Sequence, residues 1–172
     1  MAANTQSSEV PAEPMWLSDR EQAAWRGLLD LHDRVMARLH QELRRESDLS
    51  GPDYSVLVGL SEAPGQLLRA RELGALLHWE KSRLSKQITR MEERRLVQRQ
   101  VCPTDARGSF VVLTDVGRNA IELAAPLHLR HVRECFIDVL TTEQLGQLAE
   151  ISATVVAQLG CDGAAAAAAC DD

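Results

Sequence analysis

Hydrophobic residues recur at helical spacing in long stretches near both ends of the chain. Between residues 18 and 46 the apolar positions fall three or four residues apart, which predicts one long helix. Ser18 and Glu21 form a Ser-x-x-Glu capping box at its start. The same spacing predicts further helices over 115–139 and 141–159. The first of these helices is long for a compact domain, so we expect it to pack against a partner.

A shorter helix is predicted between two breakers in the middle of the chain. The run Ser50-Gly51-Pro52-Asp53 supplies a cap and a proline that suits the first turn of a helix. The run Ala63-Pro64-Gly65 disfavours helix and is expected to end it. Leu67 and Leu68 follow directly and are expected to add a short strand to a small sheet.

Two helices joined by a tight turn, and then a β-hairpin, are predicted next. The helices cover 70–77 and 80–94, and the hairpin covers 96–113 with residues 105–108 as its turn. A second helix that is polar and basic on one side is typical of a DNA-reading helix-turn-helix. The hairpin is then an attached wing.

The second helix of this pair has a polar face opposite its apolar one. On a helical wheel Leu84, Ile88 and Met91 form the stripe that is expected to be buried. The opposite side and its flank combine short polar side chains with long cations, a mixture that reads base edges and grips phosphates. An exposed amphipathic helix on a scaffold is the alternative interpretation. The residues predicted to contact DNA are Ser82, Arg83, Ser85, Lys86, Thr89 and Arg90.

The predicted wing carries one arginine near its tip. Arg107 suits insertion into a narrow minor groove. Asp105, two residues earlier, is expected to orient the guanidinium group. A plain surface turn with a local ion pair is the alternative.

Charge is unevenly distributed along the chain. The whole chain carries −6, which taken alone argues against nucleic acid. Residues 69–107 nevertheless hold ten Lys or Arg and five Asp or Glu, a net charge of +5 that leaves −11 for the remainder. A basic segment on an acidic body is typical of a DNA-binding module.

The fold class expected from these elements is mainly α with a small β-wing. Its parts are a disordered arm (1–15), an N-terminal dimerisation helix (16–48), a winged helix-turn-helix (49–117), C-terminal dimerisation helices (118–160) and a disordered tail (161–172). Long terminal helices with apolar stripes can pair across a two-fold axis, so we expect a homodimer with two reading heads. An intramolecular bundle is the alternative.

Three motifs in the central segment resemble the MarR (multiple antibiotic resistance regulator) family. They are the run Lys81–Lys86, the wing motif Asp105-x-Arg107-Gly108 and the following Leu113-Thr114-x-x-Gly117. The resemblance covers roughly residues 49–136 by motif and the terminal helices by pattern only. It implies a homodimeric transcription regulator, usually a repressor that small aromatic or lipophilic molecules release from double-stranded DNA with a pseudo-palindromic sequence.

The resemblance also implies roles for individual residues. The family reads the major groove at the positions of Ser82, Arg83, Ser85 and Lys86, and its wing enters the minor groove at the position of Arg107. Its effector pocket lies between the dimer layer and the reading head. The candidates there are Trp25, His32 and Tyr54, although aromatic residues at helical spacing are more often core.

Two positions depart from the family pattern. Arg95 stands after the second helix where the family usually has Gly, and a left-handed backbone there costs a non-Gly residue about 1 kcal/mol. Ala106 occupies a wing-tip position that is often basic. The turn at Arg95 is therefore either strained or built differently, whereas Ala106 puts the strength of the wing contact in question, not the wing.

Other functions are weakly supported. No arrangement of nucleophile, base, paired carboxylates or phosphate loop has the spacing that catalysis needs, so we predict no enzyme and no cofactor. His128 and His131 have a spacing that can share a metal, but no further ligand is fixed by spacing, so we predict no metal site. Cys102 and Cys135 leave a thiol-oxidation sensor as an alternative, and a winged-helix module that binds protein instead of DNA is another.

The expected location is the cytoplasm, with the protein associated with the nucleoid. No N-terminal apolar stretch follows a basic region, and no apolar run approaches the length that spans a membrane. We therefore expect no membrane partner.

Overall fold

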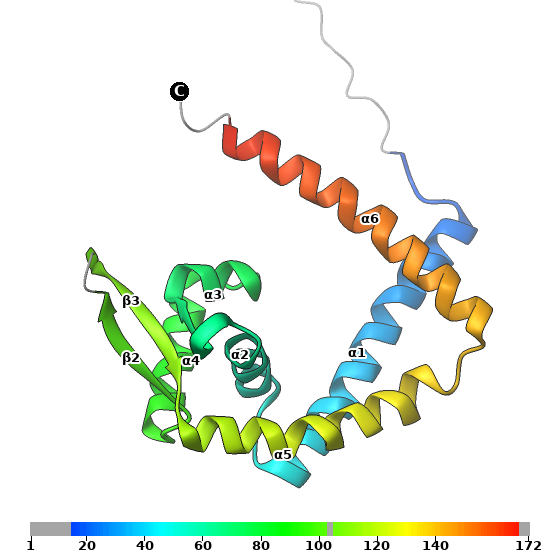
Figure 1. Cartoon of the computed structure of the whole chain (residues 1–172). Helices are drawn as coiled ribbons and strands as arrows, with labels where there is room; N and C mark the ends of the chain where they lie inside the picture. Colours follow the sequence, from blue (N-terminus) through cyan, green and yellow to red (C-terminus); the bar gives the residue numbers. More distant parts are fainter. Residues whose placement is uncertain (1–14, 103–104, 169–172) are drawn as a thin grey trace, which may run out of the picture. The chain divides into compact units, whose positions relative to one another are not determined.

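The computed structural model describes residues 15–102 and 105–168, with side chains described for 15–101 and 109–159. The chain divides into two compact units, Met1–Arg34 (the N-terminal unit) and Val35–Asp172 (the main unit), and each is described by itself. Figure 1 labels the elements. The helices are α1 (Asp19–Ser47), α2 (Gly51–Ser61), α3 (Ala70–Leu76), α4 (Lys81–Glu93), α5 (Asp115–Val132) and α6 (Thr142–Ala168), with short 3₁₀ and π segments at Pro64–Gln66 and Arg133–Ile137. The strands are β1 (Leu67–Arg69), β2 (Val97–Cys102) and β3 (Asp105–Leu113).

The predicted capping box starts α1 in the N-terminal unit. The Ser18 backbone N–H donates to Glu21 Oε2 at 2.8 Å, and the Glu21 backbone N–H donates to Ser18 Oγ at 3.4 Å. Large apolar side chains in this unit are exposed, among them Trp16, Trp25 and Leu28. The apolar stripe that predicted the helix is therefore uncovered here.

The strands form one antiparallel sheet in the order β1-β3-β2. Leu67 pairs with Val112, so the short strand expected at Leu67 and Leu68 is confirmed. β2 and β3 form the wing hairpin, with Val97 opposite Leu113 (Figure 1).

The core of the main unit lies where α2, α3, α4 and the sheet meet. Its largest side chains expose 1% or less of their surface. Truncating such a side chain to Ala costs about 2–5 kcal/mol of stability, so these positions fix the packing of α2, α3 and α4 against the sheet. They include Leu57, Leu60, Leu73, Ile88 and Met91.

The passage from wing to α5 depends on a glycine. Thr114 caps α5 by accepting from the Gly117 N–H at 3.0 Å, while its hydroxyl contacts the Leu96 carbonyl oxygen at 3.0 Å. A Cβ on Gly117 would lie 2.0 Å from that same oxygen. The backbone of α5 therefore passes too close to β2 for any side chain, which explains the Leu-Thr-x-x-Gly motif.

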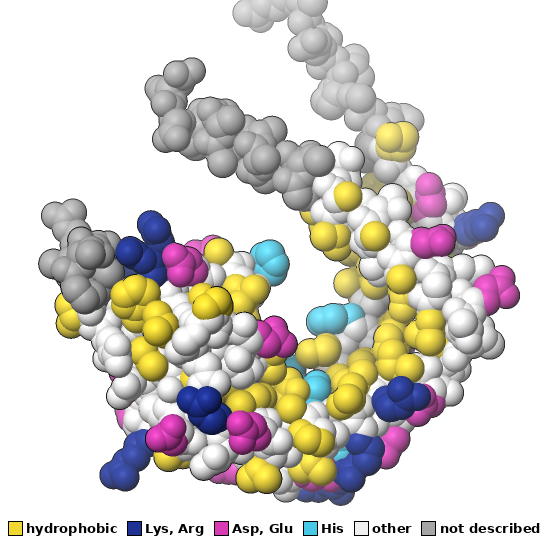
Figure 2. Space-filling view, viewed as in Figure 1, with side chains coloured by type: hydrophobic (Ala, Val, Ile, Leu, Met, Phe, Trp, Pro, Cys, Tyr) yellow, Lys and Arg dark blue, Asp and Glu magenta, His cyan; other side chains and the backbone are white. Residues whose placement is uncertain are grey.

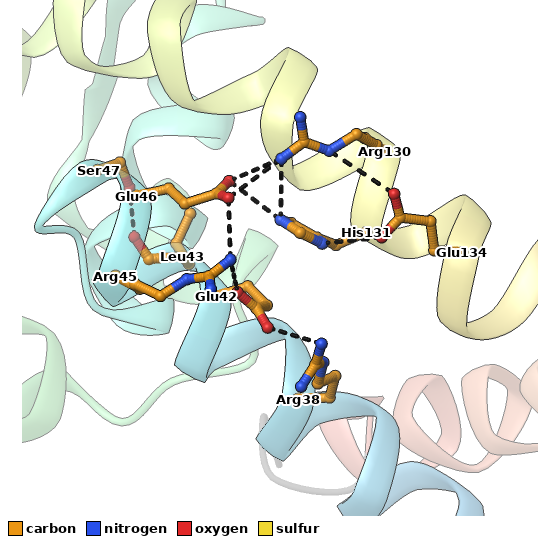
Figure 3. Close-up of polar contacts among 9 residues, drawn as sticks. All are labelled: Arg38, Glu42, Leu43, Arg45, Glu46, Ser47, Arg130, His131 and Glu134. Carbon is orange, nitrogen blue, oxygen red and sulfur yellow. Dashed lines mark hydrogen bonds and ion pairs between the residues drawn. The ribbon is translucent and has the colours of Figure 1, made fainter.

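Ion pairs tie the last turns of the main-unit part of α1 to α5 (Figure 3). Glu46 Oε1 accepts from Arg130 Nη2 at 3.1 Å, and Glu46 Oε2 lies 3.0 Å from His131 Nε2. The hydrogen bond with His131, assisted by the charges of Arg130, His131 and Arg45, lowers the pKa of the Glu46 carboxyl below its ordinary value of 4.5. We call Glu46, Arg130 and His131 the α1–α5 clamp.

The clamp borders a possible metal-ligand set. Donor atoms of Glu42, Glu46 and His131 lie within 4.8 Å of one another. Arg38 and Arg45 pair with the buried Glu42 carboxylate at 2.8 and 2.5 Å, so guanidinium groups already neutralise the negative charge that would attract a cation. The geometry is that of an ion-pair cluster that fastens two helices.

Three boundary predictions need correction or fall outside the structure. Residues 105–108, predicted as a turn, belong to strand β3 because the Cys102–Asp105 pairing carries the hairpin further out. The predicted disordered tail is helical as far as Ala168, because alanine has the highest helix propensity of the amino acids and this segment is a run of alanines. The disordered arm predicted for 1–15 lies outside the described residues except for Met15.

Candidate nucleic-acid interface

Helix α4 has the two faces that its pattern predicted. Leu84, Ile88 and Met91 are buried against the core of the main unit. The side chains predicted to contact DNA lie on the exposed part of the helix, and their contact with DNA stays a prediction. They are Ser82, Arg83, Ser85, Lys86, Thr89 and Arg90.

Arg83 is positioned by an aromatic ring at the start of α4. Its guanidinium carbon lies 4.4 Å from the centroid of the Trp79 ring. A cation over an indole face gains about 0.5–1 kcal/mol at an exposed site and loses rotamer freedom. The interaction holds the charge at the flank of the reading face.

Arg99 on β2 fastens the wing to α4. Its guanidinium forms an ion pair with Glu92, and Nη2 donates to the Ser85 carbonyl oxygen at 2.9 Å and to Thr89 Oγ1 at 3.1 Å. The Thr89 hydroxyl also donates to the Ser85 carbonyl at 3.1 Å. Thr89 is thus engaged within the protein, and a base contact by its hydroxyl competes with the link to Arg99.

Two polar residues that make long-range contacts at α4 were missed from the sequence. Gln87 is buried and its amide donates to Asp53 Oδ1 at 2.6 Å. Its signal was a polar side chain among Leu84, Ile88 and Met91 on the apolar stripe. Arg99 had no such signal, because an alternating strand pattern does not say which helix residue an exposed arginine meets.

Arg95 ends α4 in the left-handed conformation that its position predicted, with φ of 59°. The Leu96 N–H donates to the Met91 carbonyl oxygen and the Arg95 N–H to that of Glu92, both at 2.9 Å. These two bonds make a Schellman cap, which usually places Gly at this position. The turn therefore has ordinary geometry and carries the strain of a non-glycine side chain.

A groove of about 780 Å³ lies beside the reading face, between α3, the start of α4 and the sheet. Arg69, Arg71 and Lys81 contribute to its lining. The Arg69 guanidinium lies 5.5 Å from the centroid of the Phe110 ring. The cations surround an apolar floor, which is suitable for the sugar–phosphate backbone of a duplex.

The wing residues of the prediction cannot be placed in this way. The backbone of β3 begins at Asp105, but the side chains of Asp105 and Arg107 lie outside the described ones. Their predicted roles at the minor groove stay predictions.

A second cavity, of about 390 Å³, lies between the main-unit part of α1, α2, α3 and α5. Tyr54 and His128 line it with ring centroids 4.4 Å apart, and His40 lies nearby. Burial raises the pKa of the Tyr54 hydroxyl, with a smaller contribution from Glu62. Burial also lowers the pKa of His128, helped by the charges of His131 and His40, so both rings stay neutral near pH 7.

The other candidates for an effector pocket and for thiol or metal chemistry are spread over the fold. Trp25 and His32 belong to the N-terminal unit and are exposed. His128 contacts Tyr54 whereas His131 contacts Glu46, so the two histidines do not face one shared partner. Cys135 is half-buried, and the Cys102 side chain lies outside the described ones.

Comparison with known proteins identifies the family. A sequence model described as the MarR family matches residues 47–108. The transcriptional regulator HosA of Escherichia coli O111:H- is 33% identical over 104 residues, which cover 60% of this chain and 73% of HosA. The chain belongs to the MarR family. Its relatives in this comparison are transcriptional regulators.

Solved MarR structures share the fold over most of the chain. AbsC, a MarR family transcriptional regulator from Streptomyces coelicolor, is 40% identical with a TM-score of 0.80, over 85% of this chain and 98% of AbsC. Sco3205, a MarR regulator from the same organism solved in complex with DNA, is 36% identical with a TM-score of 0.80, over 83% of this chain and 90% of Sco3205. The mainly helical winged-helix fold predicted from the sequence is confirmed. In the described part of this MarR chain, every helix is too short or too polar to cross a membrane.

Proposed function

We propose that this MarR protein is a homodimeric, sequence-specific transcription regulator that inserts α4 into the major groove of double-stranded DNA. The observation that carries the proposal is the exposed polar and cationic face of α4, which Arg99 links to the wing and where Arg83 lies over the Trp79 ring. A MarR relative at 36% identity was solved in complex with DNA, which supports DNA binding by this chain.

The residues of this face divide into two roles. Ser82 and Ser85, near the amino end of α4, are suited to base edges or phosphates through short hydrogen bonds. Lys86 and Arg90 are suited to phosphates or to guanine. A docking face for protein would instead carry apolar or aromatic anchors, which disfavours the protein-binding alternative.

Homodimerisation is supported by apolar side chains that the described structure leaves exposed. They lie along α1 in the N-terminal unit and along α6, where Figure 2 shows hydrophobic side chains on the visible face. Ile151, Val155 and Leu159 recur at four-residue spacing on α6. Solvent contact with such a stripe is unfavourable, and a second copy of the chain would cover it.

Release by a small molecule is supported by the cavity beside Tyr54 and His128. Its volume suits a small aromatic or lipophilic compound, and its two neutral rings offer stacking and hydrogen bonds. We propose that such a compound acts on a repressor. The test is a screen of small aromatic acids and phenols for release of bound DNA, in which Tyr54→Ala should raise the concentration needed for release.

DNA binding is tested by selecting duplexes from a random pool with the full chain. We expect a pseudo-palindrome whose affinity falls steeply with salt, because Lys and Arg displace counterions from phosphates. Lys86→Ala should weaken binding of the selected duplex by about fivefold to a hundredfold if it reads a base. Arg26→Ala, which removes an exposed cation from α1, is the matched control. Unchanged affinity in Lys86→Ala would exclude Lys86 from the DNA contact. An affinity that does not change with salt would contradict the proposal.

A further inference from the structure

A buried polar network joins the first turn of α2 to the middle of α4. Asp53 exposes 4% of its surface and Gln87 exposes 3%. The Gln87 amide nitrogen donates to Asp53 Oδ1 at 2.6 Å. Burying two polar side chains is unfavourable unless both are fully hydrogen-bonded, so each partner in this pair matters.

Asp53 is fixed independently of Gln87. Its Oδ2 accepts from the Ser50 backbone N–H at 2.9 Å, from Ser50 Oγ at 2.7 Å and from Arg94 Nη1 at 2.8 Å. The Asp53 N–H in turn donates to Ser50 Oγ at 3.2 Å. The capping box and Arg94 therefore hold one oxygen of the carboxylate and leave the other directed at α4.

The carboxylate decides which way the Gln87 amide faces. A carboxylate oxygen accepts hydrogen bonds, so the amide nitrogen must face Asp53 and the amide oxygen must face away. That oxygen, Oε1, accepts from Arg90 Nη2 at 2.5 Å. Arg90 is exposed on the reading face and uses one of its five N–H donors in this bond.

We infer that Gln87, held by Asp53, is a positioning residue that orients the Arg90 guanidinium for DNA contact, an inference that rests on the proposed function. The neighbouring arginines Arg94 and Arg99 are paired with the carboxylates of Asp53 and Glu92. An amide oxygen orients a guanidinium without cancelling its charge. Arg90 therefore keeps its full charge for a phosphate or a guanine while its rotamer is already selected.

A double-mutant cycle on the full chain tests the inference, with affinity measured for the duplex selected by the wild type. Arg90→Ala should lower this affinity about tenfold. Gln87→Met keeps an unbranched side chain but removes the acceptor, and it should lower the affinity several-fold in the wild type. In the Arg90→Ala background it should change affinity less than about twofold, because the residue that it positions is gone. Gln41→Met, at an exposed position of α1, is the matched control.

A purely structural role predicts a different cycle. If loss of Gln87 displaced α4, contacts of Ser85 and Lys86 would also weaken, and the effects of Gln87→Met and Arg90→Ala would multiply. Multiplying effects would overturn the inference while DNA binding by the wild type still supports the proposed function. A wild type that selects no duplex would overturn both.

A second variant covers the case in which Gln87→Met does not fold. Gln87→Lys gives the buried Asp53 carboxylate a donor and still removes the acceptor for Arg90. We expect Gln87→Lys to melt close to the wild type and to make Arg90→Ala nearly silent for the selected duplex. A tenfold effect of Arg90→Ala that persists in this background would overturn the inference.

Discussion

Arg95 carries backbone strain at the end of α4. Its φ of 59° costs a residue with a Cβ about 1 kcal/mol. A glycine there avoids this cost, but it also makes the unfolded chain more flexible, which offsets part of the stabilisation. We expect Arg95→Gly to raise the free energy of unfolding by about 0.5 kcal/mol in urea titrations. Glu93→Gly, in the last turn of α4, should instead lower it by up to about 1 kcal/mol. Equal losses in both variants would contradict the strain at Arg95.

Gly117 is the opposite case, a residue whose missing side chain is required. Because its Cβ would lie 2.0 Å from the Leu96 carbonyl oxygen, Gly117→Ala must push α5 away from β2. We expect it to lower the free energy of unfolding by about 1–3 kcal/mol in thermal melts. Gly146→Ala has open space around the new methyl group and should stabilise α6 by about 0.5–1 kcal/mol. A Gly117→Ala protein as stable as wild type would contradict the close approach of Gly117 to the Leu96 carbonyl oxygen.

At the scale of elements, the α1–α5 clamp makes stability depend on pH. The pKa of Glu46 is lower in the folded chain than in the unfolded one, so the ionised carboxylate stabilises the fold above about pH 4.5. That contribution is lost as the pH falls through the lowered pKa and the carboxylate gains a proton. We expect Glu46→Gln to unfold at a lower temperature than wild type at pH 7, and we expect this difference to narrow as the pH falls below 4.5.

The control for the clamp is an exposed carboxylate elsewhere. Glu150→Gln on α6 should follow the pH profile of the wild type. If the difference between Glu46→Gln and wild type does not narrow at any pH below 4.5, the ionised form of Glu46 is not the stabilising species.

The elements themselves were predictable because their ends carry local chemistry. Ser18, Ser50 and Thr114 each cap a helix by accepting a hydrogen bond from the backbone N–H three residues on, which depends on neighbouring residues alone. The hairpin turn was misplaced because its position depends on how far β2 and β3 pair. The alanine-rich end of α6 has low complexity, which predicts a disordered tail, but it is helical as far as Ala168 because alanine has high helix propensity.

The candidate interface was predictable in part for a related reason. The exposed face of α4 follows from helical periodicity, so its residues are found from the chain alone. Gln87 and Arg99 act through partners 34 and 14 residues away, and periodicity says nothing about such pairs. The sequence therefore predicts which side chains face outward but not what holds them there.

At the scale of the whole molecule, the proposed dimer makes a testable link between α6 and DNA binding. A charge in the apolar stripe of α6 should disfavour the covering of that stripe by a second copy. We expect Val155→Glu, at a side chain now 54% exposed, to shift the protein toward a monomer in sedimentation experiments and to weaken binding to a two-half-site duplex. Ala157→Glu, at an exposed position on the opposite side of the same helix, is the control. A Val155→Glu protein that sediments like wild type would contradict the role of α6 in the dimer interface.

The way α5 leaves the wing has a mechanical consequence. At one end Thr114 bonds to the carbonyl of Leu96, directly before the strand that carries Arg99, and at the other end His131 contacts Glu46. Helix α5, with Pro126 inside it, has 18 residues between these points and is about 27 Å long. A tilt of about 5° at the His131 end moves the wing end by about 2 Å over that length. A small tilt that leaves the bonds at His131 intact would therefore move the wing end of α5 far enough to break a hydrogen bond between α4 and a base.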